Sequence, residues 1–107
     1  MISKDAKEVL YQLYKEYLSR RKSGISKPQA VDFGSAESVL KALFPDWTSG
    51  NLFSALNELK QNGYLSNSYY DNKITRCELT NSAIVLMENQ KKDTLKSVLD
   101  FVAKFVP

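Results

Sequence analysis

Histidine is absent from this sequence, and cysteine occurs only once, as Cys77. The missing histidine removes the Ser-His-Asp and Cys-His nucleophile systems, the usual proton shuttle at neutral pH and a principal zinc ligand. A lone cysteine allows neither an internal disulfide nor a cysteine-rich metal site. We therefore expect a protein that is not an enzyme and that binds no metal.

Glycine and long apolar runs are also scarce. The four glycines, at positions 24, 34, 50 and 63, lie too far apart to form a phosphate-binding loop, so we expect no cofactor. No apolar run approaches the roughly 20 residues that span a bilayer, and the first seven residues lack the apolar core of a signal peptide. These absences predict a cytoplasmic protein with no membrane partner.

What is present is an ordinary globular composition with an uneven charge distribution. The 107 residues are 43% hydrophobic and 25% charged, which predicts one folded domain. The net charge is +3, yet residues 29–59 carry one basic and four acidic groups. Residues 1–28 carry seven basic and three acidic groups, and residues 60–107 carry seven and five. The basic ends favour binding to nucleic acid, whereas the acidic centre counts against it.

Two helices are predicted before Pro45. The first begins after the cap Ser3 and stops at Gly24, and the second covers residues 35–44, with Ser35 as its cap. Pro45 ends the second helix because the residue before a proline avoids the helical region. The first helix repeats apolar residues at helical spacing, namely Ala6, Val9, Leu10, Leu13, Tyr14, Tyr17 and Leu18.

The third predicted helix covers residues 48–62, between a cap at Thr48 and a stop at Gly63. Its apolar stripe consists of Leu52, Phe53, Leu56 and Leu59. A rotation of about 100° per residue puts a polar set on the opposite face, namely Asn51, Ser54, Glu58 and Gln61, with Asn57 at its edge. This face carries amides and hydroxyls, with one acid.

The segment between the first two helices, residues 25–34, is predicted to be extended. Pro28 disfavours a helix running through Lys27, and Val31-Asp32-Phe33 is typical of a short strand.

A β-hairpin is predicted after the third helix, with strands at residues 64–70 and 73–79. Asp71 and Asn72 join the strands, and both residue types tolerate the positive φ of a tight turn. Alternation along the second strand puts Thr75, Cys77 and Leu79 on the inner face. Cys77 is accordingly predicted to be a core residue rather than a nucleophile.

The C-terminal part, residues 81–107, is predicted to be helical after a cap at Thr80, with a break near residues 90–93 as an option. It carries an apolar stripe that includes Leu95, Val98, Leu99, Val102 and Phe105. Such a stripe needs a partner. It either packs back on the first helix, or it forms a homodimer.

This order of elements resembles the winged helix-turn-helix superfamily. The resemblance is carried by Leu56-Asn57-Glu58-Leu59-Lys60-Gln61-Asn62-Gly63-Tyr64-Leu65 and by Cys77-Glu78-Leu79-Thr80, although Ala83 replaces the glycine frequent in the family. It implies an α+β, mainly α fold with a three-helix core, a β-hairpin wing near residues 64–79 and an extra C-terminal helix. Residues 1–80 would form the winged core, as in small single-domain bacterial or phage regulators.

The resemblance also implies a function, sequence-specific DNA binding as a transcriptional regulator. The helix at residues 48–62 would be the recognition helix in the major groove of double-stranded DNA. Its candidate base readers are Asn51, Ser54, Asn57 and Gln61. The candidate phosphate contacts are Arg20, Arg21, Lys60, Lys73 and Arg76.

A second function fits the same scaffold. The acidic central segment and the single acid among the base readers, Glu58, favour a module that binds another protein through the third helix or the aromatic wing. The basic end of the first helix and the wing residues Lys73 and Arg76 favour DNA. The sequence leaves both functions open and identifies neither an operator nor an effector.

Overall fold

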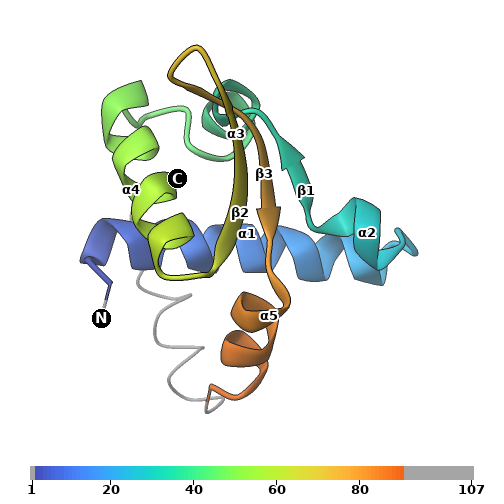
Figure 1. Ribbon diagram of the computed structural model, residues 1–107. Helices are drawn as coiled ribbons and strands as arrows, with labels where there is room; N and C mark the ends of the chain where they lie inside the picture. Colours follow the sequence, from blue (N-terminus) through green and yellow to red (C-terminus); the bar gives the residue numbers. More distant parts are fainter. Residues whose placement is uncertain (1, 91–107) are drawn as a thin grey trace.

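The computed structural model describes residues 2–90 and shows a small α+β domain. Within this range, helices surround a three-stranded antiparallel sheet (Figure 1). The elements are α1 (Lys4–Lys22), α2 (Lys27–Ala30), β1 (Asp32–Gly34), α3 (Ala36–Leu43), α4 (Ser49–Gln61), β2 (Leu65–Tyr70), β3 (Lys73–Leu79) and α5 (Asn81–Glu88). None of the described helices is both long and apolar enough to cross a lipid bilayer.

The long helix α1 begins and ends where its sequence predicts. Ser3 Oγ accepts a hydrogen bond from the Ala6 amide at 3.2 Å, and the left-handed φ of +88° at Gly24 follows the C-terminal end. One position of its predicted apolar stripe was wrong. Leu18 is 44% exposed, so it lies outside the buried part of the helix, which includes Val9 and Leu13.

The segment that follows α1 differs from the sequence prediction. A short helix, α2, contains Pro28 in its first turn, where the extended interpretation of residues 25–34 allowed no helix. Proline is tolerated there because the amides of a first turn have no partner within the helix. The predicted strand is confirmed one residue later, as β1, which lies at the edge of the sheet.

The sheet has the order β1-β3-β2, with β3 at the centre. The predicted hairpin is confirmed, and its turn residues Asp71 and Asn72 have φ values of 52° and 61°. The predicted alternation along β3 is wrong at one end: Ile74 is buried and Thr75 is exposed. The pairing shifts there, since Ser68 faces Arg76 whereas the next residue of β2 faces Ile74. Thr75 is the extra residue of a β-bulge, which reverses the facing of the strand.

Helices α3 and α4 confirm the second and third predicted helices. The cap Thr48 accepts a hydrogen bond from the Asn51 amide at 3.1 Å, and Gly63 adopts a φ of +82° just after α4. The buried face of α4 differs slightly from its predicted stripe, because Ala55 is buried whereas Phe53 is only half-buried.

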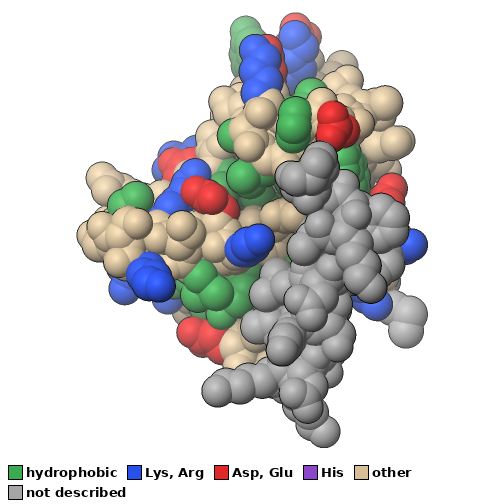
Figure 2. Space-filling model, turned by 180° about the vertical axis from the view of Figure 1, so that it is seen from behind, with side chains coloured by type: hydrophobic (Ala, Val, Ile, Leu, Met, Phe, Trp, Pro, Cys, Tyr) green, Lys and Arg blue, Asp and Glu red, His purple; other side chains and the backbone are tan. Residues whose placement is uncertain are grey.

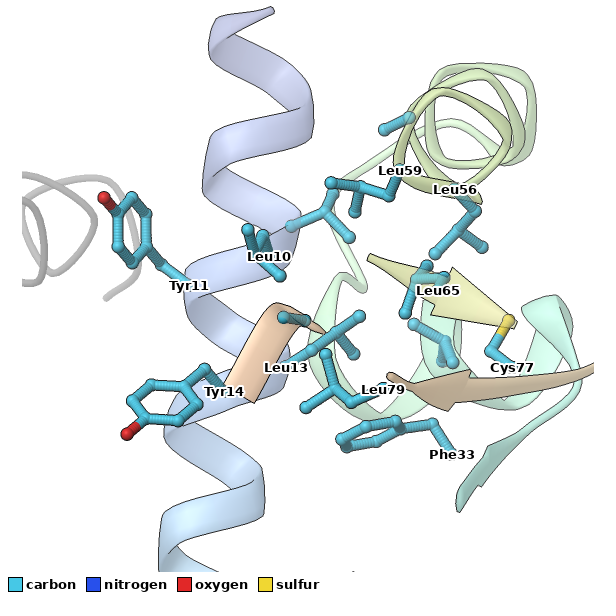
Figure 3. Packing of buried hydrophobic residues seen from close by; sticks show 14 of the residues in the cluster. Leu10, Tyr11, Leu13, Tyr14, Phe33, Leu56, Leu59, Leu65, Cys77 and Leu79 are labelled. Carbon is cyan, nitrogen blue, oxygen red and sulfur yellow. The ribbon is translucent and has the colours of Figure 1, made fainter. Parts of the chain in front are cut away.

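One hydrophobic core joins the helices to the sheet (Figure 3). Leu10 and Leu13 of α1 point toward Leu59 of α4 and Leu79 of β3, while the hydroxyl of Tyr11 points the other way. Side chains of α1 therefore pack against both α4 and the sheet.

The last described helix, α5, is capped as predicted by Thr80, which accepts a hydrogen bond from the Ala83 amide at 3.2 Å. Ala83, Ile84 and Met87 join the core. α5 ends at Glu88, before the break considered at residues 90–93. The predicted dimerisation residues, Leu95, Val98, Leu99, Val102 and Phe105, lie outside the described residues.

Candidate functional site

Helix α4 presents a polar outer face to solvent. Asn51, Ser54 and Gln61 are exposed on this face, whereas Asn57 is half-buried. The side chains of Asn51, Ser54 and Gln61 are therefore accessible to a ligand such as DNA, which is the first requirement for reading bases.

Asn57 is held by the hairpin. The Tyr69 hydroxyl donates a hydrogen bond to Asn57 Oδ1, and Asn67 Nδ2 donates to that hydroxyl at 3.4 Å and to the Leu56 carbonyl at 3.2 Å. The Lys60 ammonium lies 5.8 Å from the centre of the Tyr69 ring, within range of a cation–π interaction. This cluster fixes β2 against α4, and Asn57 is committed to it.

Glu58, the acid predicted on the outer face, points to the N-terminus of α1. Its carboxylate accepts hydrogen bonds from Ser3 Oγ at 2.7 Å and from the Ser3 backbone amide. These two bonds lower the pKa of Glu58, with the side-chain bond contributing most. The ionised carboxylate therefore lies at the N-terminus of α1, where the positive end of the helix dipole stabilises it, and it remains accessible to solvent.

Arg20 links α1 to β1. Its Nη1 donates to the Asp32 carbonyl at 2.8 Å, its Nε is 3.2 Å from Glu16 Oε1, and its guanidinium carbon lies 4.7 Å from the centre of the Phe33 ring. Arg21 donates to the Ile25 carbonyl at 3.0 Å. Both arginines belong to the last turn of α1, and this end of α1 lies beside α2 and away from α4 (Figure 1). They do not share a surface with the outer face of α4.

The two basic residues predicted on the wing have different surroundings. Arg76 forms ion pairs with Asp32 at 3.0 Å and with Glu78 at 3.4 Å, so its charge is offset by two carboxylates. Lys73 is exposed beside the hairpin turn. Two of the predicted phosphate contacts remain near the proposed interface, namely Lys60 in α4 and Lys73 at the hairpin tip. Neither forms an ion pair with another described residue.

No single-sign patch dominates the face shown in Figure 2. Blue and red side chains alternate there, with hydrophobic side chains between them. The visible part of this face therefore offers individual charged groups rather than one extended basic field.

A groove of about 710 Å³ opens between α3, the first turn of α4 and the hairpin tip. Its residues are Ser35, Ala36, Glu37, Leu40, Lys41, Ser49, Gly50, Leu52, Phe53, Asn72, Lys73, Ile74 and Thr75. Lys41 and Glu37 are paired at 3.0 Å, and the pKa of Glu37 is lowered mainly by this hydrogen bond, then by the charge of Lys41 and less by Lys73. Sequence reasoning missed the groove because its walls come from three separate segments.

The thiol of Cys77 is unsuited to nucleophilic catalysis. The side chain is completely buried, and burial, with a smaller effect from the Asp32 charge, raises its pKa to about 12. Such a thiol stays protonated at neutral pH and is not a nucleophile. The described residues also contain no cluster of three or more side chains of the types that hold metal ions.

No protein-family model matches the chain, and searches of curated proteins and of solved structures give no significant match either. Any assignment of function therefore depends on the residues of this chain alone.

Proposed function

We propose that this protein is a sequence-specific DNA-binding protein of the winged helix-turn-helix type, with a regulatory role in transcription. Helix α4 would enter the major groove, and the β2–β3 hairpin would serve as the wing. The order of helices and the β1-β3-β2 sheet support this proposal, because the helices precede a hairpin that leaves directly from the end of α4.

The observation that carries the proposal is the outer face of α4. It exposes Asn51, Ser54 and Gln61, while its nearest acid, Glu58, is bound to the N-terminus of α1. Amide side chains pair with adenine edges, and serine serves several bases. The bonds to Ser3 hold the Glu58 carboxylate at the N-terminus of α1, which answers one objection that the sequence raised, whereas the other three acidic groups of residues 29–59 remain.

The charges near α4 predict modest affinity. Lys60 and Lys73 are the cations that the proposal assigns to phosphates, with Arg20, Arg21 and Arg76 engaged elsewhere. Two phosphate contacts give a slope of about −2 in a plot of log affinity against log salt, and a dimer doubles it.

The first test is binding to random-sequence duplex DNA across a salt titration. Binding in the micromolar range at low salt, with a slope of about −2 to −4, supports the proposal. If the protein does not bind duplex DNA even at low salt, the DNA-docking proposal fails.

A second test separates base reading from phosphate contact once a preferred sequence has been selected. Asn51→Ala removes a base reader, so we expect relaxed specificity, with a loss of about 1–3 kcal/mol on the preferred site only. Lys73→Gln removes a phosphate contact, so all sequences bind more weakly and the salt slope falls by about 1. Equal effects of Asn51→Ala on all sequences would contradict its reading role.

The regulatory proposal includes a homodimer formed by the apolar stripe of residues 95–105. A two-fold protein matches two half-sites related by the same symmetry. Sedimentation at increasing concentration tests this, and Leu99→Asp should shift the protein to monomer.

One observation favours a protein partner instead of DNA. Tyr70 at the hairpin tip is 77% exposed, and exposed tyrosines are typical of protein interfaces. If duplex DNA does not bind, a protein partner of the hairpin can be sought by its binding to the native protein. A true partner should bind Tyr70→Ser more weakly, so this variant is the matched negative control.

A further inference from the structure

The groove between α3, α4 and the hairpin has one apolar wall. Leu52 and Ile74 are buried there, and Leu40 and Phe53 are half-buried. The groove volume of about 710 Å³ lies in the range of about 300–1,000 Å³ that holds small molecules in proteins. The wall therefore offers an aromatic ring or a short alkyl chain a surface to pack against.

The polar side of the groove is positive. Lys41 and Lys73 line it together with a single carboxylate, Glu37, which leaves one net positive charge. Lys73 is close enough to Glu37 for its charge to lower the pKa of that carboxyl. A ligand with one negative charge would neutralise this net charge of the groove. A cationic ligand would be repelled, and a ligand with two negative charges would leave one of them unpaired.

The backbone adds to this polarity. Ala36 and Glu37 in the first turn of α3, and Ser49 and Gly50 in the first turn of α4, all line the groove. The first turns of both helices, where the positive ends of the helix dipoles lie, therefore border the groove. These first turns and the two lysines make the polar side of the groove favourable for an anion, next to the apolar wall that carries Phe53.

We propose that this groove binds a small amphipathic anion, with an aromatic or aliphatic body and one carboxylate. The binding itself is independent of DNA. A consequence that rests on the proposed function is regulatory: the groove is formed by the hairpin turn and the first turn of α4, so an occupied groove would compete with DNA.

The probe is 2-naphthoate, and its matched control is the neutral 2-naphthamide, which has the same ring system. Titration of the full-length ¹⁵N-labelled protein, followed by amide chemical shifts, reports both affinity and location. We expect naphthoate to shift amides around Leu40, Phe53 and Ile74, and to bind at least about fivefold more tightly than the amide. A fivefold ratio corresponds to about 1 kcal/mol, the interaction of two unit charges about 4 Å apart when water screens them fully.

Substitutions at Gly50 isolate the charge of the groove. A β-carbon at Gly50 would have open space around it, with no heavy atom within 4 Å outside its chain neighbours and its own helix backbone, so the position accepts a larger residue. Gly50→Glu adds a negative charge in the first turn of α4, which suits the helix dipole but repels an anion. Gly50→Gln has the same size without the charge. We expect Gly50→Glu to weaken naphthoate binding more than Gly50→Gln does, and Lys73→Gln to weaken it about fivefold.

Three results would overturn the proposal: no amide shifts at the groove, shifts centred elsewhere, or equal affinity for naphthoate and naphthamide. Competition is measured separately, by adding naphthoate to the protein–DNA complex. A protein that binds naphthoate but not DNA retains the groove proposal and loses the DNA proposal. A protein that binds DNA but not naphthoate retains the DNA proposal and loses the groove proposal.

Discussion

At the scale of single residues, Cys77 shows how burial controls chemistry. It lies in the central strand β3, and its pKa is raised to about 12 by burial and by Asp32. The native thiol should therefore react with 5,5′-dithiobis(2-nitrobenzoate) only as fast as the protein unfolds. The same protein in denaturant should react at once. Rapid modification of the native protein would contradict the burial of this residue.

The raised pKa of Cys77 also makes stability depend on alkaline pH. In the unfolded chain the thiol ionises near its ordinary pKa of 9.0, whereas in the folded protein it resists ionisation to about 12. Its contribution to stability is therefore complete below pH 9.0 and is lost as the pH rises from there toward about 12. Urea midpoints of the native protein and of Cys77→Ala should converge over this window, because the variant lacks the titrating group.

Glu58 gives the opposite pH dependence. Its pKa is lowered by hydrogen bonds from the side chain and then the backbone of Ser3. A depressed pKa stabilises the fold above the unfolded value, and this contribution is lost as the pH falls through the folded value. Thermal unfolding should show Glu58→Gln less stable than the native protein at neutral pH, with the difference shrinking at about pH 3. A constant difference at both pH values would exclude this mechanism.

At the scale of elements, the hairpin is tied to α4 by the hydroxyl of Tyr69. Tyr69→Phe keeps the ring but removes the donor to Asn57 and the acceptor for Asn67, so we expect a loss of about 0.5–1.5 kcal/mol in the free energy of unfolding. Amide hydrogens of β2 should also exchange faster. Tyr70→Phe is the control, because this adjacent side chain is 77% exposed and its hydroxyl is open to water.

This link affects how α4 and the hairpin act together. Because Asn57 is bound to Tyr69, we expect a substitution at either residue to affect the hairpin as well as the face of α4. Asn51 is exposed in the first turn of α4, about two turns before Asn57 reaches this cluster, and it is the cleaner position for testing the proposed base reading.

At the scale of the whole molecule, α1 holds the other elements together. Leu13 is completely buried in the common core, whereas Leu18 on the same helix is 44% exposed. Leu13→Ala should cost about 2–5 kcal/mol in the free energy of unfolding, a large part of the stability of a small domain. Leu18→Ala should change it by less than about 0.5 kcal/mol. Urea unfolding of the two variants measures both values, and equal losses would contradict the central position of Leu13 in the core.

Local signals in the sequence determined where elements begin and end. Ser3, Ser35, Thr48 and Thr80 each accept a hydrogen bond from the amide three residues later, as their sequence positions predict. Asp71 and Asn72 form the predicted hairpin turn with positive φ. These features depend on contacts within a few residues of the chain, so the residue types alone are sufficient to indicate them.

The tertiary structure alone determined which distant side chains contact one another and which face the solvent. Glu58 binds Ser3, which lies 55 positions earlier, and Arg76 pairs with Asp32, which lies 44 positions earlier. Thr75 is turned outward by a bulge in its pairing with β2, and the groove exists only where α3, α4 and the hairpin meet. Periodicity within one element cannot specify such pairings, because they depend on which distant segments pack side by side.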